Sequence, residues 1–293
     1  MANVTAGIAP DSWGVWFAED PRQTPWQRYL DEIAQLGFRH TELGPYGYLP
    51  TERDRLAREL DHRGLLLTAG AVMFDLEDPD AVARTAEEVE QVCSLVSALG
   101  GSYLLIIDDV YTNLFTGEPR LPAELDAPGW DRLVATTVAL CEQAERHGLR
   151  GAFHPHAQCH VEYESQIERL LADAPIVSLC LDVGHHAYCG GDPVAFMERH
   201  ADRIPYLHLK SVDGELAARV RRDGIPFAQA VADGVFVEPS EGVVDFRRLH
   251  EVVERVGYQG VATIEQDMYP ADFERPLPIA RRTKAFLSTL GWS

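Results

Sequence analysis

Short apolar runs alternate with longer amphipathic stretches along the whole chain. Eight of the apolar runs are long enough for strands, at residues 4–9, 38–43, 65–68, 102–107, 149–153, 177–181, 204–209 and 261–264. Between them, apolar residues recur at the three- to four-residue spacing of a helix, as in residues 81–99, 131–147 and 246–256. The pattern predicts that strands and helices alternate from one end of the chain to the other.

A glycine stands one to four positions before five of these apolar runs. The five are Gly37, Gly64, Gly100, Gly148 and Gly257, each at the end of a helix-like stretch. Glycine is favoured just past a helix C-terminus because it adopts the left-handed conformation without a Cβ clash. Each of these glycines therefore predicts a helix-to-strand turn.

Eight strand-helix units without a dividing linker favour a (β/α)8 TIM barrel of the α/β class. Parallel strands that are covered on both faces have continuous apolar sequences, as these have. A doubly wound open sheet is the rival fold, but no glycine-rich phosphate-binding turn follows any of the runs. We expect residues 1–293 to form a single TIM-barrel domain with a long loop after strand seven, at about residues 211–243.

This long loop exceeds the few residues that usually join a strand to its helix. Short helices are expected within it at residues 216–220 and 227–231. Long loops at the catalytic end of a barrel serve as lids or as subunit contacts. A lid, a contact within a homo-oligomer and an insertion without function all agree with this sequence.

The excess of acidic over basic side chains limits the kinds of molecule that the protein is expected to bind. Forty-six acidic side chains against 26 basic ones give a formal net charge of −20. Nucleic acids and anionic membrane surfaces are bound mainly by clustered lysine and arginine, so neither is an expected partner. An uncharged small molecule, such as a cyclic polyol or a keto-sugar, suits this balance better.

The chain also lacks the sequence features of secreted and membrane proteins. Its first residues have no basic start, and no apolar run approaches the roughly 20 residues of a membrane span. The five cysteines include no C-x-x-C pair, which predicts reduced thiols. We expect a cytoplasmic location.

Polar residues close the apolar runs, at the strand ends where TIM barrels carry their active sites. They are Asp11 and Trp13, Glu42, Asp108 and Asp109, His154 and His156, Asp182 and His185, His208 and Lys210, and Glu265 and Asp267. Seven of the 11 histidines lie between residues 154 and 208, several times the share that even spacing would give. Imidazole and carboxylate ligands together suit a divalent transition ion, and three consecutive strand ends could supply them.

Three segments occur in an order and at gaps that are hard to obtain by chance: Asp182-Val183-Gly184-His185, His208-Leu209-Lys210 and Glu265-Gln266-Asp267. With them, nearly the whole chain resembles the xylose-isomerase-like superfamily of sugar isomerases, epimerases and dehydratases. Within that superfamily it is most similar to the inosose dehydratase branch. The resemblance implies that Asp182, His208 and Glu265 bind Mn²⁺ or Co²⁺, and that Glu42, His185 and Lys210 face the bound sugar.

The end of the fifth strand departs from the common pattern of the superfamily. Most members carry a glutamate ligand there, whereas this chain has His154 followed by His156. The fourth ligand is thus open between these two histidines, and we expect His154. Replacing a carboxylate by a neutral imidazole raises the charge of the ion with its ligands from −1 to zero, which makes the ion a stronger Lewis acid.

The expected function is that of a metal-dependent hydro-lyase. It would remove water from a cyclic keto-polyol, an inosose, through an enediolate, in inositol catabolism. The alternative is an isomerase or epimerase of a keto-sugar or keto-inositol, which would use the same metal and enediolate. We expect His156 and Glu42 to transfer protons, while His185 and Lys210 orient hydroxyl groups.

Further residues are assigned by position alone. Trp13 and Asp267 are expected to contact the substrate, although Trp13 and the nearby Trp16 would equally suit packing under a loop. His160, His186 and His200 are expected on solvated faces. The net charge of −20 argues strongly against a DNA-repair endonuclease on the same barrel. The complete set of ligands disfavours a sugar-binding protein without catalysis.

Overall fold

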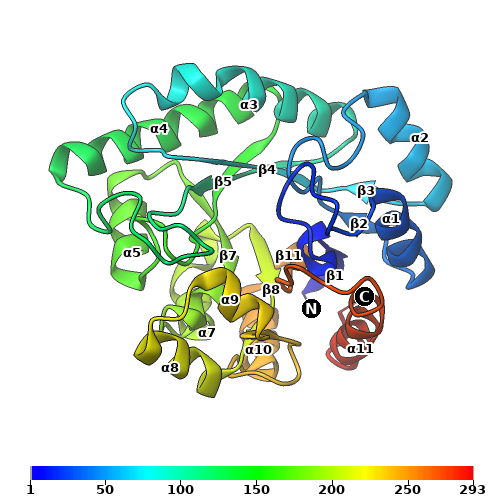
Figure 1. Ribbon diagram of the computed structural model, residues 1–293. Helices are drawn as coiled ribbons and strands as arrows, with labels where there is room; N and C mark the ends of the chain where they lie inside the picture. Colours follow the sequence, from blue (N-terminus) through cyan, green and yellow to red (C-terminus); the bar gives the residue numbers. More distant parts are fainter. Residues whose placement is uncertain (1, 293) are drawn as a thin grey trace.

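A ring of parallel strands forms the centre of the structure, with helices around it (Figure 1). The computed structural model describes residues 2–292. The strands follow the order β3-β2-β1-β11-β8-β7-β6-β5-β4, and every neighbouring pair is parallel. They are β1 (Asn3–Ile8), β2 (His40–Thr41), β3 (Leu66–Leu67), β4 (Ala69–Phe74), β5 (Tyr103–Asp108), β6 (Arg150–Phe153), β7 (Ser178–Asp182), β8 (Tyr206–Leu209) and β11 (Gln259–Ile264). Each of the eight predicted runs overlaps a strand, and the predicted TIM barrel is confirmed.

The ring closes at Thr68, which separates β3 from β4. β3 pairs with β2 and β4 pairs with β5, so the two segments are halves of one barrel strand. The Thr68 N–H donates to the Thr41 carbonyl at 2.9 Å, and the Thr68 carbonyl accepts from the Ser102 N–H at 2.9 Å. One residue therefore joins the two edges of the sheet.

The second half of that strand, residues 69–74, lies outside the predicted run. Its first half consists of the small residues Ala69, Gly70 and Ala71, which obscured it, and helix α3 (Ala81–Ala98) packs directly on the strand at Gly70. A Cβ at Gly70 would lie 2.7 Å from Val92 Cγ1 and 2.8 Å from Val96 Cγ2. Close packing between helix and strand therefore removed the bulky residues by which strands are recognised in sequence.

Helices cover the outer face of the ring, and they include the three predicted at residues 81–99, 131–147 and 246–256. Besides α3, the helices of the barrel are α1 (Trp26–Gln35), α2 (Arg53–Arg63), α4 (Ala127–Arg146), α5 (Glu164–Asp173), α6 (Val183–Tyr188), α7 (Pro193–His200), α10 (Phe246–Val256) and α11 (Pro276–Thr289), with short 3-10 turns at η1 (Pro10–Trp13) and η2 (Ala201–Arg203). Gly64 and Gly257 end α2 and α10 at φ of 67° and 69°. The other three predicted glycine turns also have positive φ, so all five are confirmed.

The segment after β8 folds into a small unit beside the barrel (Figure 1). Two short strands, β9 (Ser211–Val212) and β10 (Phe236–Val237), pair antiparallel and enclose helices α8 (Gly214–Asp223) and α9 (Phe227–Ala232). Both predicted helices are therefore present. Their apolar residues form a separate cluster that includes Phe227 and Phe236 and that Trp16 packs against.

Two apolar layers hold the barrel together. One fills the inside of the ring with a few residues, Ala69, Leu105, Ala152, Cys180 and Tyr206. The larger one lies between the strands and the helices. All five cysteines are free thiols, as predicted. Among residues 2–292, the helices are too short or too polar to cross a membrane.

Candidate metal centre and active-site pocket

Four side chains converge at the C-terminal ends of β6, β7, β8 and β11. His154, Asp182, His208 and Glu265 each place one ligand atom within 4.8 Å of the others, and we call this group the mouth cluster. His154 Nε2 lies 3.5 Å from Glu265 Oε2 and 3.7 Å from Asp182 Oδ2. His208 Nδ1 lies 2.9 Å from Glu265 Oε2. Two imidazoles and two carboxylates at these separations suit a divalent transition ion.

Asp182 owes its orientation to the helix that begins after it. Its Oδ1 accepts hydrogen bonds from the Gly184 N–H at 2.8 Å and the His185 N–H at 2.7 Å, as the N-cap of α6. This cap fixes the carboxylate and turns Oδ2 toward the mouth cluster. Oδ2 is buried and lies 2.8 Å from the ammonium nitrogen of Lys210, so this oxygen faces a cation.

His208 is held at one ring nitrogen and free at the other. Its Nε2 lies 2.9 Å from Glu42 Oε1. Its Nδ1 is buried without a hydrogen bond and faces the two carboxylates of the mouth cluster. A metal-ligating histidine usually donates its second N–H to a carboxylate or carbonyl. The pattern at His208 is therefore the one that a metal ligand requires.

Lys210 places a fully buried ammonium group beside the mouth cluster. Its Nζ lies 2.8 Å from Asp182 Oδ2, 2.6 Å from Asp267 Oδ2 and 3.3 Å from Glu265 Oε2. Burial alone would lower the pKa of Lys210, but these three carboxylates raise it well above its usual range. Gly184 makes room for the side chain, since a Cβ there would lie 2.2 Å from Lys210 Cγ.

His156 and His185 form an imidazole pair next to His154. Their ring centroids are 3.8 Å apart, and both rings pack on Phe227. His156 Nδ1 bonds the Ala157 carbonyl at 2.8 Å. Burial lowers the pKa of His156 to about 3 and that of His185 well below its usual value, so both rings are neutral.

A cavity of about 320 Å³ opens on the mouth cluster. Its polar lining comes from Asp11, Glu42, His208, Glu265 and Glu88, and its apolar lining includes Trp16, Val72, Met73, Leu105 and Ile107. Burial, then the neighbouring carboxylates of Glu265 and Asp267, raise the pKa of Asp11 well above its usual range. Neither lysine nor arginine is among the described residues that line this cavity.

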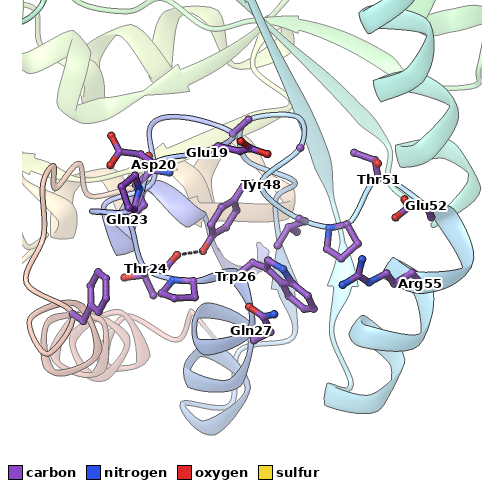
Figure 2. Close-up of a pocket in the computed structure, with 17 residues that line it drawn as sticks. Glu19, Asp20, Gln23, Thr24, Trp26, Gln27, Tyr48, Thr51, Glu52 and Arg55 are labelled. Atoms are coloured by element: carbon purple, nitrogen blue, oxygen red, sulfur yellow. Dashed lines mark hydrogen bonds between the residues drawn. The ribbon is translucent and has the colours of Figure 1, made fainter.

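A second pocket, of about 660 Å³, lies beside the mouth between the segments that follow β1 and β2 (Figure 2). Tyr48 donates its hydroxyl proton to the Thr24 carbonyl at 2.9 Å across its floor. Trp26 and Arg55 line it, with the guanidinium carbon 5.7 Å from the indole ring. None of the mouth cluster residues lines this pocket, so its larger volume does not make it the better candidate site.

The structure brings together most of the residues that the sequence singled out. His154, Asp182, His208 and Glu265 share the mouth cluster, and His156, His185, Lys210, Glu42 and Asp267 lie directly around it. Of the two histidines after β6, it is His154 whose ring enters the cluster. The sequence identified Asp11 only as a strand-end residue. It did not point to Tyr206, because a tyrosine within an apolar strand is indistinguishable in sequence from a core residue.

Trp13 lies elsewhere. It is fully buried, and its Nε1–H donates to Glu32 Oε2 at 2.6 Å, under α1. The expected substrate contact is therefore not available to Trp13, and of the two tryptophans it is Trp16 that lines the cavity. The 3-10 turn after β1 causes this difference because it directs Trp13 inward.

The expectation of solvated histidines is wrong for two of the three. His160 is buried, with Nδ1 bonded to Asp108 Oδ2 at 2.8 Å and Nε2 to the Pro122 carbonyl at 3.1 Å. His186 is also buried, 3.2 Å from Glu164 Oε2. Carboxylates from distant parts of the sequence compensate for the burial of both rings, which the local sequence does not reveal.

Comparisons with known proteins agree with this fold. The profile of the family described as xylose isomerase-like TIM barrel matches residues 30–290. The rhizopine catabolism protein MocC of Rhizobium meliloti is 33% identical over 254 residues, covering 84% of this chain and 76% of that protein. Inosose dehydratase of Bacillus licheniformis is 29% identical over 290 residues, covering 96% and 94%. A solved structure of the IOLI protein with a binding zinc atom superposes with a TM-score of 0.72 at 16% identity, covering 98% of each chain.

Proposed function

The chain belongs to the xylose isomerase-like TIM-barrel family, and from this premise we propose that it is a metal-dependent dehydratase of a cyclic keto-polyol, an inosose. Its similarity to inosose dehydratases over nearly the full length places it among the lyases. One observation carries the proposal: four potential ligands lie together with an imidazole pair beside them, and two of the ligands, His208 and Glu265, line a cavity. Ligands and proton-transfer groups are the two parts that a metal-assisted elimination requires.

The ion would be held by His154, Asp182, His208 and Glu265. We propose Mn²⁺ or Co²⁺, because a set of nitrogen and oxygen donors without a thiolate suits these ions. When bound, the ion would supply Lewis-acid polarisation of the substrate ketone. The buried Nδ1 of His208, which makes no hydrogen bond, supports this assignment.

The side chains around the ligands would move the protons. A neutral imidazole accepts a proton, so we assign His156 to the removal of the proton on the carbon next to the ketone. The C–H electron pair then forms a carbon-carbon double bond as the β-hydroxyl leaves. Lys210, the one ammonium group beside the mouth cluster among the described residues, would give that hydroxyl its proton, so that water departs. His185 and Asp267 would orient the remaining hydroxyls.

The cavity suits an uncharged ring. A cyclic polyol with equatorial hydroxyls carries its C–H bonds on its two faces, and these faces pack on apolar side chains. Trp16, Val72 and Ile107 offer such a surface, while the carboxyl groups of Asp11 and Glu88 can form hydrogen bonds with hydroxyls. A phosphate or carboxylate on the substrate would meet acidic side chains without a lining cation to offset them.

The test is turnover of scyllo-inosose by protein loaded with Mn²⁺ or Co²⁺, against an EDTA-treated control. The product is expected to be lighter than the substrate by one water, and only in the loaded sample. A product of unchanged mass would instead assign the isomerase or epimerase reaction, which uses the same groups but returns the proton to the carbon. Metal-independent turnover would contradict the proposed role of the mouth cluster.

A further inference from the structure

Glu42 lines the cavity, and one of its carboxylate oxygens contacts His208, a residue of the mouth cluster. We propose that Glu42 is a positioning residue: it fixes the ring of His208 so that Nδ1 faces the ion, and it is itself fixed by the Tyr206 hydroxyl. This inference rests on the proposed function in one respect, that the mouth cluster binds a divalent ion. It replaces the proton-transfer role that the sequence suggested for Glu42.

The contacts of Glu42 Oε1 carry the proposal. This oxygen lies 2.9 Å from His208 Nε2 and accepts a hydrogen bond from the Tyr206 hydroxyl at 2.9 Å. Glu42 is only 4% exposed, and its two partners are 1% exposed. Two donors on one oxygen occupy both of its lone pairs. Oε1, held this way, orients the proton that it receives and has no lone pair left to remove another from the substrate.

The bond from His208 Nε2 also decides which ring nitrogen can bind the ion. Accepting a hydrogen bond at Glu42 requires the proton of His208 to reside on Nε2, which leaves Nδ1 as a lone-pair donor. Nδ1 is the atom that faces Asp182 Oδ2 and Glu265 Oε2, at 3.8 Å and 2.9 Å. Glu42 therefore selects the tautomer that metal binding needs.

Tyr206 connects Glu42 to hydroxyl groups from other strands of the barrel. Its oxygen lies 2.8 Å from Thr68 Oγ1 and 2.8 Å from Thr263 Oγ1. Tyr206 has a single proton, and that proton is committed to Glu42, so the Thr263 hydroxyl can serve as the donor toward the tyrosine oxygen. Thr68 is the residue that closes the barrel. The orientation of His208 is thereby anchored where the sheet itself is joined.

Metal affinity and turnover together distinguish positioning from proton transfer. We expect Glu42→Ala to bind Co²⁺ about 10- to 100-fold more weakly in calorimetry, the usual cost of losing a carboxylate behind a ligating histidine. We expect Glu42→Gln to stay within about fivefold of wild type in Co²⁺ affinity and in kcat, because the amide oxygen still accepts from Nε2. Tyr206→Phe should weaken binding by about two- to tenfold, the value of one hydrogen bond.

The visible spectrum of bound Co²⁺ gives a readout that a merely structural role would not change. Glu42→Ala should shift the bands because the imidazole ligand turns, and Glu42→Gln should restore them. Tyr103→Phe is the matched control: its ring packs edge-on at 4.9 Å from Tyr206, and its hydroxyl points to the Pro205 carbonyl at 3.5 Å. This control should leave affinity, spectrum and turnover unchanged.

Two results would overturn the inference. If Glu42→Gln binds Co²⁺ like wild type but loses more than about a hundredfold in kcat, Glu42 transfers a proton. If Glu42→Ala keeps both Co²⁺ affinity and spectrum, it does not position His208. Because the calorimetry and the spectrum need no substrate, these outcomes stay separate from a failure of the proposed dehydration. Should Glu42→Ala not fold, Tyr206→Phe carries the same test through the other contact of Oε1.

Discussion

Two groups of histidine and carboxylate side chains lie in this barrel, and they differ in which atoms are free. One is the mouth cluster. The other, which we call the β5 cluster, consists of Glu77, Asp108 and His160, whose ligand atoms also lie within 4.8 Å of one another. By residue type and spacing, both groups could hold a metal ion. Their hydrogen bonds make them different.

In the β5 cluster, both nitrogens of the histidine are occupied. His160 Nδ1 bonds Asp108 Oδ2 at 2.8 Å and Nε2 bonds the Pro122 carbonyl at 3.1 Å. Since both partners are acceptors, the ring is a protonated imidazolium, and it forms a buried ion pair with Asp108. In the mouth cluster, by contrast, His208 Nδ1 makes no hydrogen bond. Proximity of ligands is therefore not sufficient for a metal site, because the histidine must also keep a ring nitrogen unoccupied.

The largest expected effect separates the clusters by metal content. We expect His154→Ala and His208→Ala to weaken Co²⁺ binding by more than about 100-fold, because losing a residue behind a ligand already costs 10- to 100-fold. His160→Ala should retain one ion per chain. Metal analysis after dialysis measures this directly. If His160→Ala loses the ion while His208→Ala keeps it, the two clusters have been assigned in the wrong order.

The next largest effect distinguishes the proposed ligand His154 from its neighbour His156. We expect His156→Ala to keep its metal but to lower kcat on scyllo-inosose by about 10²- to 10⁴-fold, the usual contribution of a general base. Metal content and kcat are measured on the same preparation. Loss of the ion in this variant would instead make His156 the fourth ligand, and unchanged kcat would remove it from the reaction.

A smaller effect is expected on the free energy of unfolding when the β5 cluster is changed. His160→Gln breaks a fully buried ion pair, and we expect it to lower the free energy of unfolding by about 3 kcal/mol. His200→Gln is the control, since its pairing with Glu168 is near the surface and such pairs contribute at most about 1 kcal/mol. Urea unfolding in EDTA measures both without a contribution from bound metal. Equal losses in the two variants would contradict the ion-pair description.

The smallest expected effect is the pH dependence of the difference in unfolding free energy between wild type and His160→Gln. Burial alone would lower the pKa of His160. Asp108 and then Glu77 raise it by more than burial lowers it, so the pKa lies above the usual 6.5. A group whose pKa is raised by folding stabilises fully below its unfolded pKa, and this contribution is lost as the pH rises through the folded pKa. The stability gap between wild type and His160→Gln should therefore shrink on going from about pH 6 to about pH 9. A gap that widens over this range would mean that His160 is neutral.

Much of the fold followed from local patterns. Apolar runs and helix-ending glycines depend on residues a few positions apart, and such patterns place strands and helices correctly. Residues 69–74 escaped because contact with α3 demands small side chains there. The sequence also predicted which polar residues share the active-site face, since parallel strands bring their C-terminal ends to one face.

The sequence by itself determined the barrel, the convergence of its polar strand ends and the types of ligand at its mouth. Only the tertiary structure decided which atoms of those ligands stay free. Asp108 ends a strand as Asp182 does, yet it turns to His160 and the Leu76 N–H. Trp13 turns to Glu32, and Glu42 to His208. The physical reason is that successive side chains on a strand point to opposite sides and that their hydrogen-bonding partners come from segments distant in sequence.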